Sequence, residues 1–166
     1  MRAGVALGAN LGDRLANLRK ARNDIAALSS VQPPIHASAI YETEPVGCEA
    51  SAAKFLNAAI EFEYAGDAPN LLRELAVIEK SLGRPAAHAR NVSRSIDLDL
   101  LYFGELEIDT PELQLPHPRV TEREFVLRPL AEISPDLILP KQTEPVQALL
   151  LRFARSSEVV RTDSKW

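Results

Sequence analysis

The most constraining feature of this chain is a strand-like segment at residues 96–103 (IDLDLLYF), in which two acidic residues alternate with apolar ones. Because successive side chains of a strand point to opposite faces, Asp97 and Asp99 share one face and the apolar residues between them share the other. This segment is the clearest strand in the chain, and it places two carboxylates side by side on one surface.

Five further elements are predicted upstream from the spacing of apolar residues. They are a strand at 5–7, a helix at 13–28, a strand at 35–43 after a break at Pro33-Pro34, a strand at 55–64 and a helix at 67–82. Asp13 and Asp67 are placed as N-caps of the two helices, and Gly83 ends the second helix.

The resulting order is strand, helix, strand, strand, helix, strand. It predicts an α+β fold with a ferredoxin-like βαββαβ core, in which an antiparallel sheet carries helices on one face. We expect a single domain over residues 1–166, with the core at about 1–103. The proline-rich extension at 104–166 should wrap the sheet with short helices and an extra hairpin.

Composition limits the compartment and the partners. The net charge is −4 and only 5% of residues are aromatic, so we expect no nucleic-acid binding. Cys48 is the only cysteine, which excludes an internal disulfide and fits a reducing compartment. The first residues form neither a secretory signal nor a membrane span, so we expect a cytoplasmic protein that is not bound to membranes. We also expect a monomer.

The acid pair suits a divalent cation. The Cα atoms of Asp97 and Asp99 should lie roughly 6.5–7 Å apart, and carboxylates so close repel unless a cation sits between them. Hard oxygen ligands on one face suit Mg²⁺, which takes its remaining ligands from water and substrate phosphates, and a pair of ions would also fit. Taken alone, a pattern this short and common more often marks a solvated strand face.

Basic residues just upstream favour a phosphate site. Arg84, Arg90 and Arg94 precede the acid pair, and the guanidinium group matches phosphate oxygens in shape and charge. Acids beside arginines form the arrangement that phosphoryl transfer requires. Asn57 and Phe55 share a face of the strand at 55–64, where an amide and an aromatic ring could bind a flat, polar-edged heterocycle; ordinary sheet packing explains them equally well.

Seven segments in series resemble the 6-hydroxymethyl-7,8-dihydropterin pyrophosphokinase family of folate synthesis. They are GANLGD (8–13), YETEPVG (41–47), FLNAAI (55–60), IEKSLGR (78–84), RSIDLDLLYFG (94–104), LPHPR (115–119) and FVLRPLAEISP (125–135). The resemblance implies that the hydroxymethyl oxygen of the pterin attacks the β-phosphorus of ATP, so that AMP leaves and the pterin carries away a diphosphate.

The resemblance also implies roles for individual residues. Two Mg²⁺ ions would be held by Asp97 and Asp99, with Arg84 and Arg94 as catalytic phosphate ligands. ATP would further contact Glu79, Arg90, His117 and Arg123. The pterin would contact Asn57, the backbone of Thr43 and Val46, and the rings of Phe55 and Phe125.

Some positions depart from the family pattern. Asn91, Val92 and Ser93 stand where members often have Trp-Gly-Pro, and Ala86 stands where some have a second arginine. Phe55 replaces a tyrosine, and Pro118 stands where a tyrosine is also found. We expect the segments at 46–54 and 84–93 to close over bound ATP and exclude water.

Two other functions remain open from the residues alone. A ferredoxin-like module could bind a small molecule without catalysis, since fold does not determine function. A metal-dependent nucleotidyl-transfer enzyme could also use paired acids on a strand. The reaction product distinguishes the two enzymes, because the pyrophosphokinase releases AMP whereas the nucleotidyl-transfer enzyme releases pyrophosphate.

Overall fold

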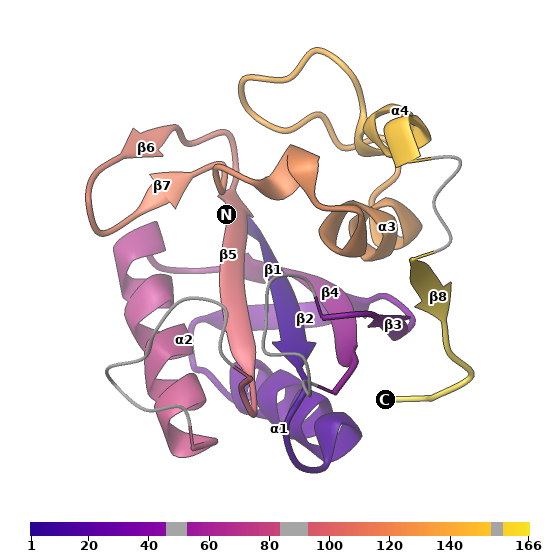
Figure 1. Cartoon of the computed structure of the whole chain (residues 1–166). Helices are drawn as coiled ribbons and strands as arrows, with labels where there is room; N and C mark the ends of the chain where they lie inside the picture. The colour runs from indigo at the N-terminus through magenta and orange to yellow at the C-terminus, as the bar shows by residue number, and fades with distance from the viewer. Residues whose placement is uncertain (46–52, 84–92, 154–157) are drawn as a thin grey trace.

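The computed structural model describes residues 1–45, 53–83, 93–153 and 158–166, and its elements follow the chain in the order drawn in Figure 1. The strands and helices are β1 (Arg2–Ala9), α1 (Arg14–Ala26), β2 (Val31–Ala37), β3 (Tyr41–Thr43), β4 (Phe55–Tyr64), α2 (Ala68–Ser81), β5 (Asp97–Phe103), β6 (Ile108–Asp109), β7 (Gln114–Leu115), α3 (Glu124–Ile133), α4 (Val146–Leu150) and β8 (Val159–Arg161). Two 3₁₀ turns, η1 (Val120–Glu122) and η2 (Leu151–Phe153), complete them.

The main sheet is antiparallel throughout and has the order β5-β1-β4-β3-β8, with β2 also paired to β4. Without β8, this is the strand order that a ferredoxin-like βαββαβ core requires, and the expected fold class is confirmed. The sheet puts β5 at one edge, next to β1, and β4 on the other side of β1.

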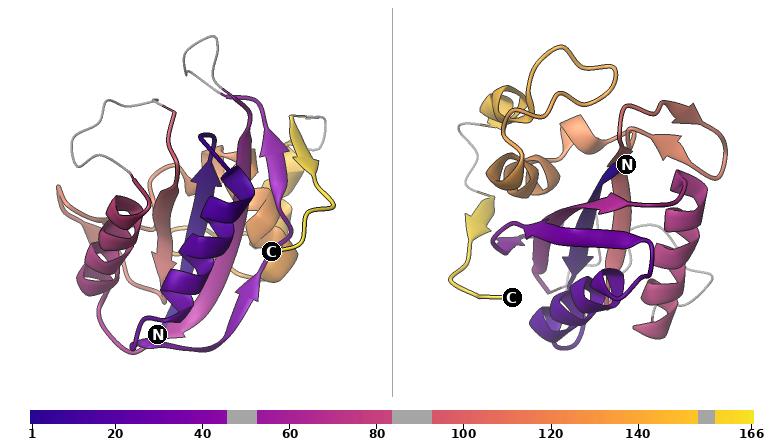
Figure 2. Two further views of the ribbon diagram at one scale, coloured as in Figure 1. Left: turned by 90° about the horizontal axis from the view of Figure 1, so that it is seen from below. Right: turned by 180° about the vertical axis from the view of Figure 1, so that it is seen from behind.

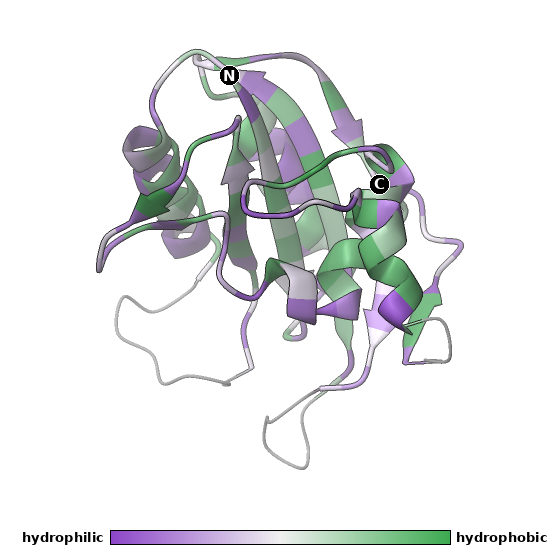
Figure 3. Cartoon of the chain, turned by 90° about the horizontal axis from the view of Figure 1, so that it is seen from above, coloured by the Kyte–Doolittle hydropathy of each residue, from purple (hydrophilic) through white to green (hydrophobic). Residues whose placement is uncertain are grey.

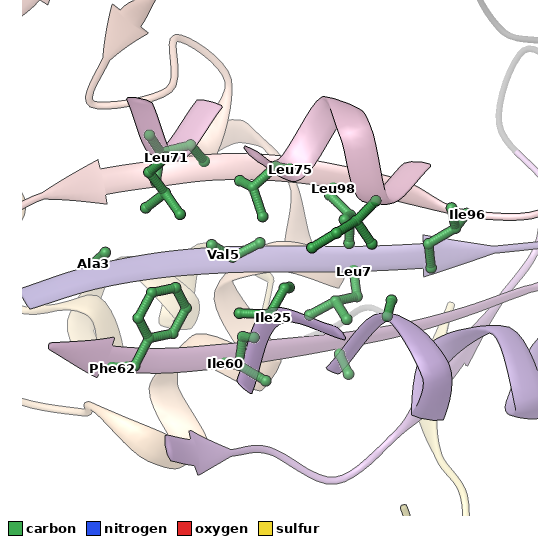
Figure 4. Close-up of a cluster of buried hydrophobic side chains, with 14 of the residues drawn as sticks. Ala3, Val5, Leu7, Ile25, Ile60, Phe62, Leu71, Leu75, Ile96 and Leu98 are labelled. Carbon is green, nitrogen blue, oxygen red and sulfur yellow. The ribbon is translucent and has the colours of Figure 1, made fainter. Parts of the chain in front are cut away.

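The first face of the sheet carries the main core. Helix α1 contributes Ile25 and α2 contributes Leu71 and Leu75, which pack on apolar side chains of β1, β4 and β5 (Figure 4). Both helices begin at the predicted caps: Asp13 accepts a hydrogen bond from the Ala16 N–H at 3.0 Å, and Asp67 accepts one from the Asn70 N–H at 2.8 Å. The helices on this face are therefore those that the sequence predicts.

The second face is covered over part of its area by the C-terminal extension. Leu127 and Leu130 of α3 and Leu149 of α4 pack with Ala59 and Leu101 of the sheet. Figure 2 shows α3 and α4 on the side of the sheet opposite α1 and α2. In Figure 3 apolar residues gather on the strands and on α3 and α4, whereas the outer side of α2 is hydrophilic. The expected wrapping by short helices and a hairpin, β6–β7, is confirmed.

The single strand predicted at residues 35–43 is wrong in its bounds. Two strands, β2 and β3, pair with β4 on either side of residues 38–40. Pro33-Pro34 lies inside β2 and does not break the chain before it. The pairing shifts register between Gln32 and His36, because proline has no N–H to donate to a ladder.

The strand β8 has no counterpart in the sequence prediction. It pairs with β3, with Thr43 opposite Val159 and Tyr41 opposite Arg161. Arg161 also forms an ion pair with Glu132 of α3 at 3.0 Å. Among the described helices none is both long enough and apolar enough to span a bilayer.

Candidate active site

The candidate site occupies the half of the second sheet face that carries polar residues. Gly8 on β1 pairs with Asn57 on β4 and with Asp97 on β5, so the three strands present these residues in one row. Asp97, Asp99 and Gly8 are partly exposed, whereas Asn57 is 5% exposed. The sheet therefore places the acid pair and the Asn57 amide on one surface.

The acid pair has the predicted geometry. Leu98 and Leu100 lie in the first core, so Asp97 and Asp99 point to the opposite face. Arg94 forms an ion pair with Asp97 at 2.7 Å, and Arg123, which precedes α3, forms one with Asp99 at 3.4 Å. The prediction that Arg94 reaches the acid pair is confirmed, and the extension supplies a second arginine.

These acids fit a Mg²⁺ ion bound jointly with a nucleotide. Their side chains are 23% and 33% exposed, so oxygen atoms remain accessible for coordination. Within the described part of the chain, no three His, Cys, Asp or Glu side chains gather to enclose an ion. Mg²⁺ suits such an open site, because it keeps several waters and is commonly bound by one or two carboxylates together with substrate phosphates.

Glu79 stabilises the strand between the two acids. Its Oε1 accepts a hydrogen bond from the Leu98 N–H at 2.7 Å. Because β5 is at the edge of the sheet, this N–H would otherwise lack a strand partner. Glu79 of α2 therefore links the first-face helix directly to the backbone that carries Asp97 and Asp99.

Asn10 holds Arg94 in place, a role that the sequence analysis did not assign. Its Oδ1 accepts the Arg94 N–H at 2.7 Å, and its Nδ2 donates to Ser93 Oγ at 3.0 Å and to the Ala53 carbonyl at 3.4 Å. Asn10 is 1% exposed. An asparagine directly after an apolar strand was the available signal, but its partners lie up to 84 positions away.

His117 and Arg123 lie beside Asp99, as expected for residues near the nucleotide. Burial lowers the pKa of the His117 imidazole, the Asp99 charge opposes this shift, and Arg123 adds to it. Nδ1 of His117 accepts the Arg119 N–H at 3.2 Å, which leaves Nε2 as the protonated atom of the neutral ring. Burial also lowers the pKa of Arg123, and Asp99 again opposes the shift.

We predict that His117 is neutral at pH 7 in the free protein. Its pKa lies below the ordinary value of about 6.5, so the unfolded chain binds the proton first as the pH falls. This group therefore makes the native state less stable as the pH drops below about 6.5. An NMR titration of the His117 ring checks the prediction; a midpoint at or above 6.5 would contradict it.

A hollow of about 230 Å³ with partly apolar walls adjoins Asp99, and the sequence analysis missed it. Its walls come from α2, β5 and the segment around β7, and include Leu72, Leu100, Leu113, Asp99 and His117. Apolar walls beside charged groups are typical of small-molecule sites. No local pattern predicts this hollow, because its walls come from separate parts of the chain.

The structure brings Asn57, Phe55 and Thr43 together. Asn57 Nδ2 donates to Thr43 Oγ1 at 2.8 Å, and Thr43 stands opposite Phe55 in the strand register. The Thr43 side chain therefore orients the Asn57 amide. The predicted contact of the Thr43 backbone with the pterin stays a prediction. Phe125 lies in the first turn of α3, with the Arg123 guanidinium 5.5 Å from its ring centre.

Three predicted site residues, Val46, Arg84 and Arg90, lie outside the described residues. The same holds for the departures at Ala86, Asn91 and Val92, and for most of the two segments expected to close over ATP. Their roles stay predictions.

Comparisons with known proteins give a consistent result. Residues 4–135 match the family model of 7,8-dihydro-6-hydroxymethylpterin-pyrophosphokinase. A 2-amino-4-hydroxy-6-hydroxymethyldihydropteridine pyrophosphokinase of Bacillus subtilis is 44% identical over 132 residues, covering 78% of this chain and 75% of that protein. One of the same name from Methylorubrum extorquens is 39% identical, covering 86% of this chain and 88% of that protein.

Solved structures agree at the level of fold. The crystal structure of wild-type Plasmodium falciparum HPPK-DHPS superposes with a TM-score of 0.73 at 12% identity. The match covers 96% of this chain and 48% of that one, so this chain spans less than half of the Plasmodium protein in that structure.

Proposed function

This chain belongs to the 7,8-dihydro-6-hydroxymethylpterin-pyrophosphokinase family, whose reaction is the transfer of pyrophosphate from ATP to hydroxymethyldihydropterin in folate synthesis, and we propose which of its residues perform that transfer. The observation that carries the proposal is the row Asp97–Gly8–Asn57 across three neighbouring strands. It joins a phosphate end, with carboxylates and arginines, to a ring end, with an amide and an aromatic side chain.

At the phosphate end, Asp97 and Asp99 would hold Mg²⁺, with two ions expected. When bound, Mg²⁺ would supply neutralisation of the phosphate charge of ATP. Arg94 and Arg123, which pair with the acids in the free protein, provide the positive charge that faces the phosphates. Arg84 and Arg90 are assigned to the same phosphates through the family resemblance.

The reaction forms one bond and breaks one. The pterin hydroxyl oxygen bonds to the β-phosphorus of ATP, and the bond between that phosphorus and the oxygen bridging to the α-phosphate breaks. AMP leaves with the bridging oxygen on its phosphate, and the pterin keeps its own oxygen. The hydroxyl proton passes to solvent or to a phosphate oxygen. The protein's contribution is positioning and charge neutralisation, the terms that dominate phosphoryl transfer.

The hollow beside Asp99 is assigned to the adenine ring. Its walls include Leu72, Leu100 and Leu113, and His117 lines it at the phosphate side. Glu79 acts on the nucleotide indirectly, through the Leu98 backbone that separates the two acids.

At the ring end, Asn57 reads the polar edge of the pterin and Phe55 and Phe125 flank the ring. Asn57 is oriented by Thr43, which leaves its amide with a defined direction. Offset stacking of an aromatic side chain on a flat ring contributes roughly 0.5–1.5 kcal/mol beyond the buried area.

We also propose that the chain acts as a single-domain monomer in the cytoplasm. The lone Cys48 and the ordinary proportions of 46% hydrophobic and 25% charged residues support this assignment. Size-exclusion chromatography with light scattering tests the oligomeric state.

The test of the function is to mix the protein with ATP, Mg²⁺ and hydroxymethyldihydropterin and to identify the nucleotide product. We expect AMP and the pterin diphosphate in equal amounts, and neither when Mg²⁺ is chelated. Release of free pyrophosphate would favour nucleotidyl transfer, and ligand binding without turnover would favour a binding module.

Replacing Asn57 by alanine should weaken pterin binding while leaving ATP binding unchanged. The substitution leaves the buried polar edge of the bound pterin without a hydrogen-bond partner. Such a loss costs about 1–3 kcal/mol of binding free energy, which corresponds to roughly a 5- to 150-fold higher Kd for the pterin. Calorimetric titration with each ligand separately measures the effect. The control is Asn17→Ala on α1, whose side-chain amide donates to the nearby Leu11 carbonyl at 3.1 Å, outside the candidate site, and which should change neither affinity. Equal weakening of both ligands by Asn57→Ala would contradict the assignment.

A further inference from the structure

Gly8 lies between the two ends of the site. It is partly exposed and pairs directly with Asn57 on β4 and Asp97 on β5. Neighbouring strands are about 4.8 Å apart, so Asn57 and Asp97 are separated by about 10 Å with Gly8 midway. Anything that reaches from the ring end to the acid pair must pass over Gly8.

A side chain at Gly8 would enter this passage. A Cβ built there lies 3.3 Å from Asn57 Oδ1, 3.9 Å from Phe55 Cδ1 and 4.0 Å from the Cβ of Asp97. All three neighbours belong to the candidate site. The contacts are tight but not impossible, so an alanine would fit the fold if Asn57 moved by a few tenths of an ångström.

Gly4, on the same strand and face, provides the contrast. A Cβ at Gly4 would lie 2.1 Å from Cε1 of the buried Tyr102 ring, so core packing explains the absence of a side chain there. Packing gives no such explanation for Gly8. Its φ is also not positive, unlike that of Gly12, so backbone conformation does not require glycine either.

We propose that Gly8 is a specificity-determining residue: its missing side chain leaves the space through which the hydroxymethyl arm of the pterin reaches from the ring end to the acid pair. The inference rests on the proposed function, since it assigns the ring to Asn57 and Phe55 and the reacting phosphates to Asp97. It adds that the site distinguishes pterins by the bulk of the group at C6, in addition to reading the polar edge of the ring.

The test compares the unmodified protein with Gly8→Ala, using hydroxymethyldihydropterin and a dihydropterin that lacks the C6 arm. One methyl group too many in a closely fitting site lowers kcat/KM by about 10- to 200-fold. We therefore expect Gly8→Ala to lose this much kcat/KM with the hydroxymethyl substrate. The arm-less pterin should be weakened less than the hydroxymethyl substrate, because only the small displacement of Asn57 affects it, and ATP should bind both proteins equally. Gly8→Val should lower kcat/KM further than Gly8→Ala, because it adds more bulk to the same passage.

Each outcome decides the proposal. Equal turnover by Gly8→Ala and the unmodified protein would overturn it, and so would equal weakening of both pterins, since displacement of Asn57 would then account for the whole loss. If Gly8→Ala does not fold, the unmodified protein is tested with a pterin whose arm carries an extra methyl on the carbon next to the ring. Loss of turnover with that compound supports the proposal, and unimpaired turnover overturns it. An unmodified protein that makes no AMP would instead refute the proposed function.

Discussion

Replacing Asp97 by asparagine is expected to lower kcat by about 10²- to 10³-fold, the size of effect seen when one preorganised electrostatic group is removed from an active site. Asparagine keeps the size of the side chain but removes the charge that we propose binds Mg²⁺. The fold should be preserved, since the Asp97 side chain is 23% exposed and lies outside the core. Steady-state measurement of AMP release with saturating Mg²⁺ checks the prediction.

A second readout separates loss of metal binding from general damage. In the unmodified protein the Asp97 carboxylate repels the phosphates of metal-free ATP and also neutralises part of the Arg94 charge. Asp97→Asn removes both effects, so metal-free ATP should bind this variant more tightly than the unmodified protein. Mg²⁺ should improve ATP binding less in the variant. Asp24→Asn on α1, which removes an exposed pairing with Lys20, is the matched control and should keep full turnover. Turnover by Asp97→Asn within a few-fold of the unmodified protein would refute the role of the acid pair.

Replacing Glu61 by alanine is expected to lower the free energy of unfolding by about 1–3 kcal/mol, the cost of leaving a buried hydrogen-bonding group without its partner. Glu61 is 5% exposed and pairs with Arg2 at 2.6 Å. It also accepts hydrogen bonds from Ser134 Oγ at 2.7 Å and from the Tyr102 hydroxyl. The substitution would leave the buried Tyr102 hydroxyl and the Arg2 charge without this partner.

The Glu61 network joins Ser134, at the end of α3, to β4 and β5 of the sheet, on the half of the second face that α3 covers. Urea unfolding of Glu61→Ala checks the predicted loss. Glu63→Ala is the control, because Glu63 lies two residues away, is 56% exposed and pairs only with the N-terminal amine among the described ion pairs. That surface pair should contribute about 0–1 kcal/mol. Equal effects of the two substitutions would mean that the buried network does not anchor α3.

Local periodicity predicted the elements that depend on neighbouring residues. The alternation in residues 96–103 was sufficient to place Asp97 and Asp99 on one face, because a strand has a side-chain period of two wherever it lies in a sheet. The bounds of β4 agree with the prediction over residues 55–64. The caps at Asp13 and Asp67 were also predictable, since each contacts a backbone N–H three residues ahead.

The features that were missed all depend on residues far apart in the chain. The strand β8 is three residues long, which is too short for alternation of apolar residues to predict a strand. It is a strand because it pairs with β3. The split between β2 and β3 follows from how each pairs with β4, and the hydrogen bonds of Asn10 reach across 43 and 84 positions. Periodicity within a segment contains no information about such partners.

The sequence by itself determined the fold class, the paired carboxylates and, through seven matching segments, the family. Only the tertiary structure decided that Gly8 separates the ring end from the acid pair, that Arg123 reaches Asp99, and that α3 covers one half of the second face and not the other. The physical reason is that backbone alternation and capping act between near neighbours, whereas an active site is made by strands and helices whose contacts form only when the whole sheet is assembled.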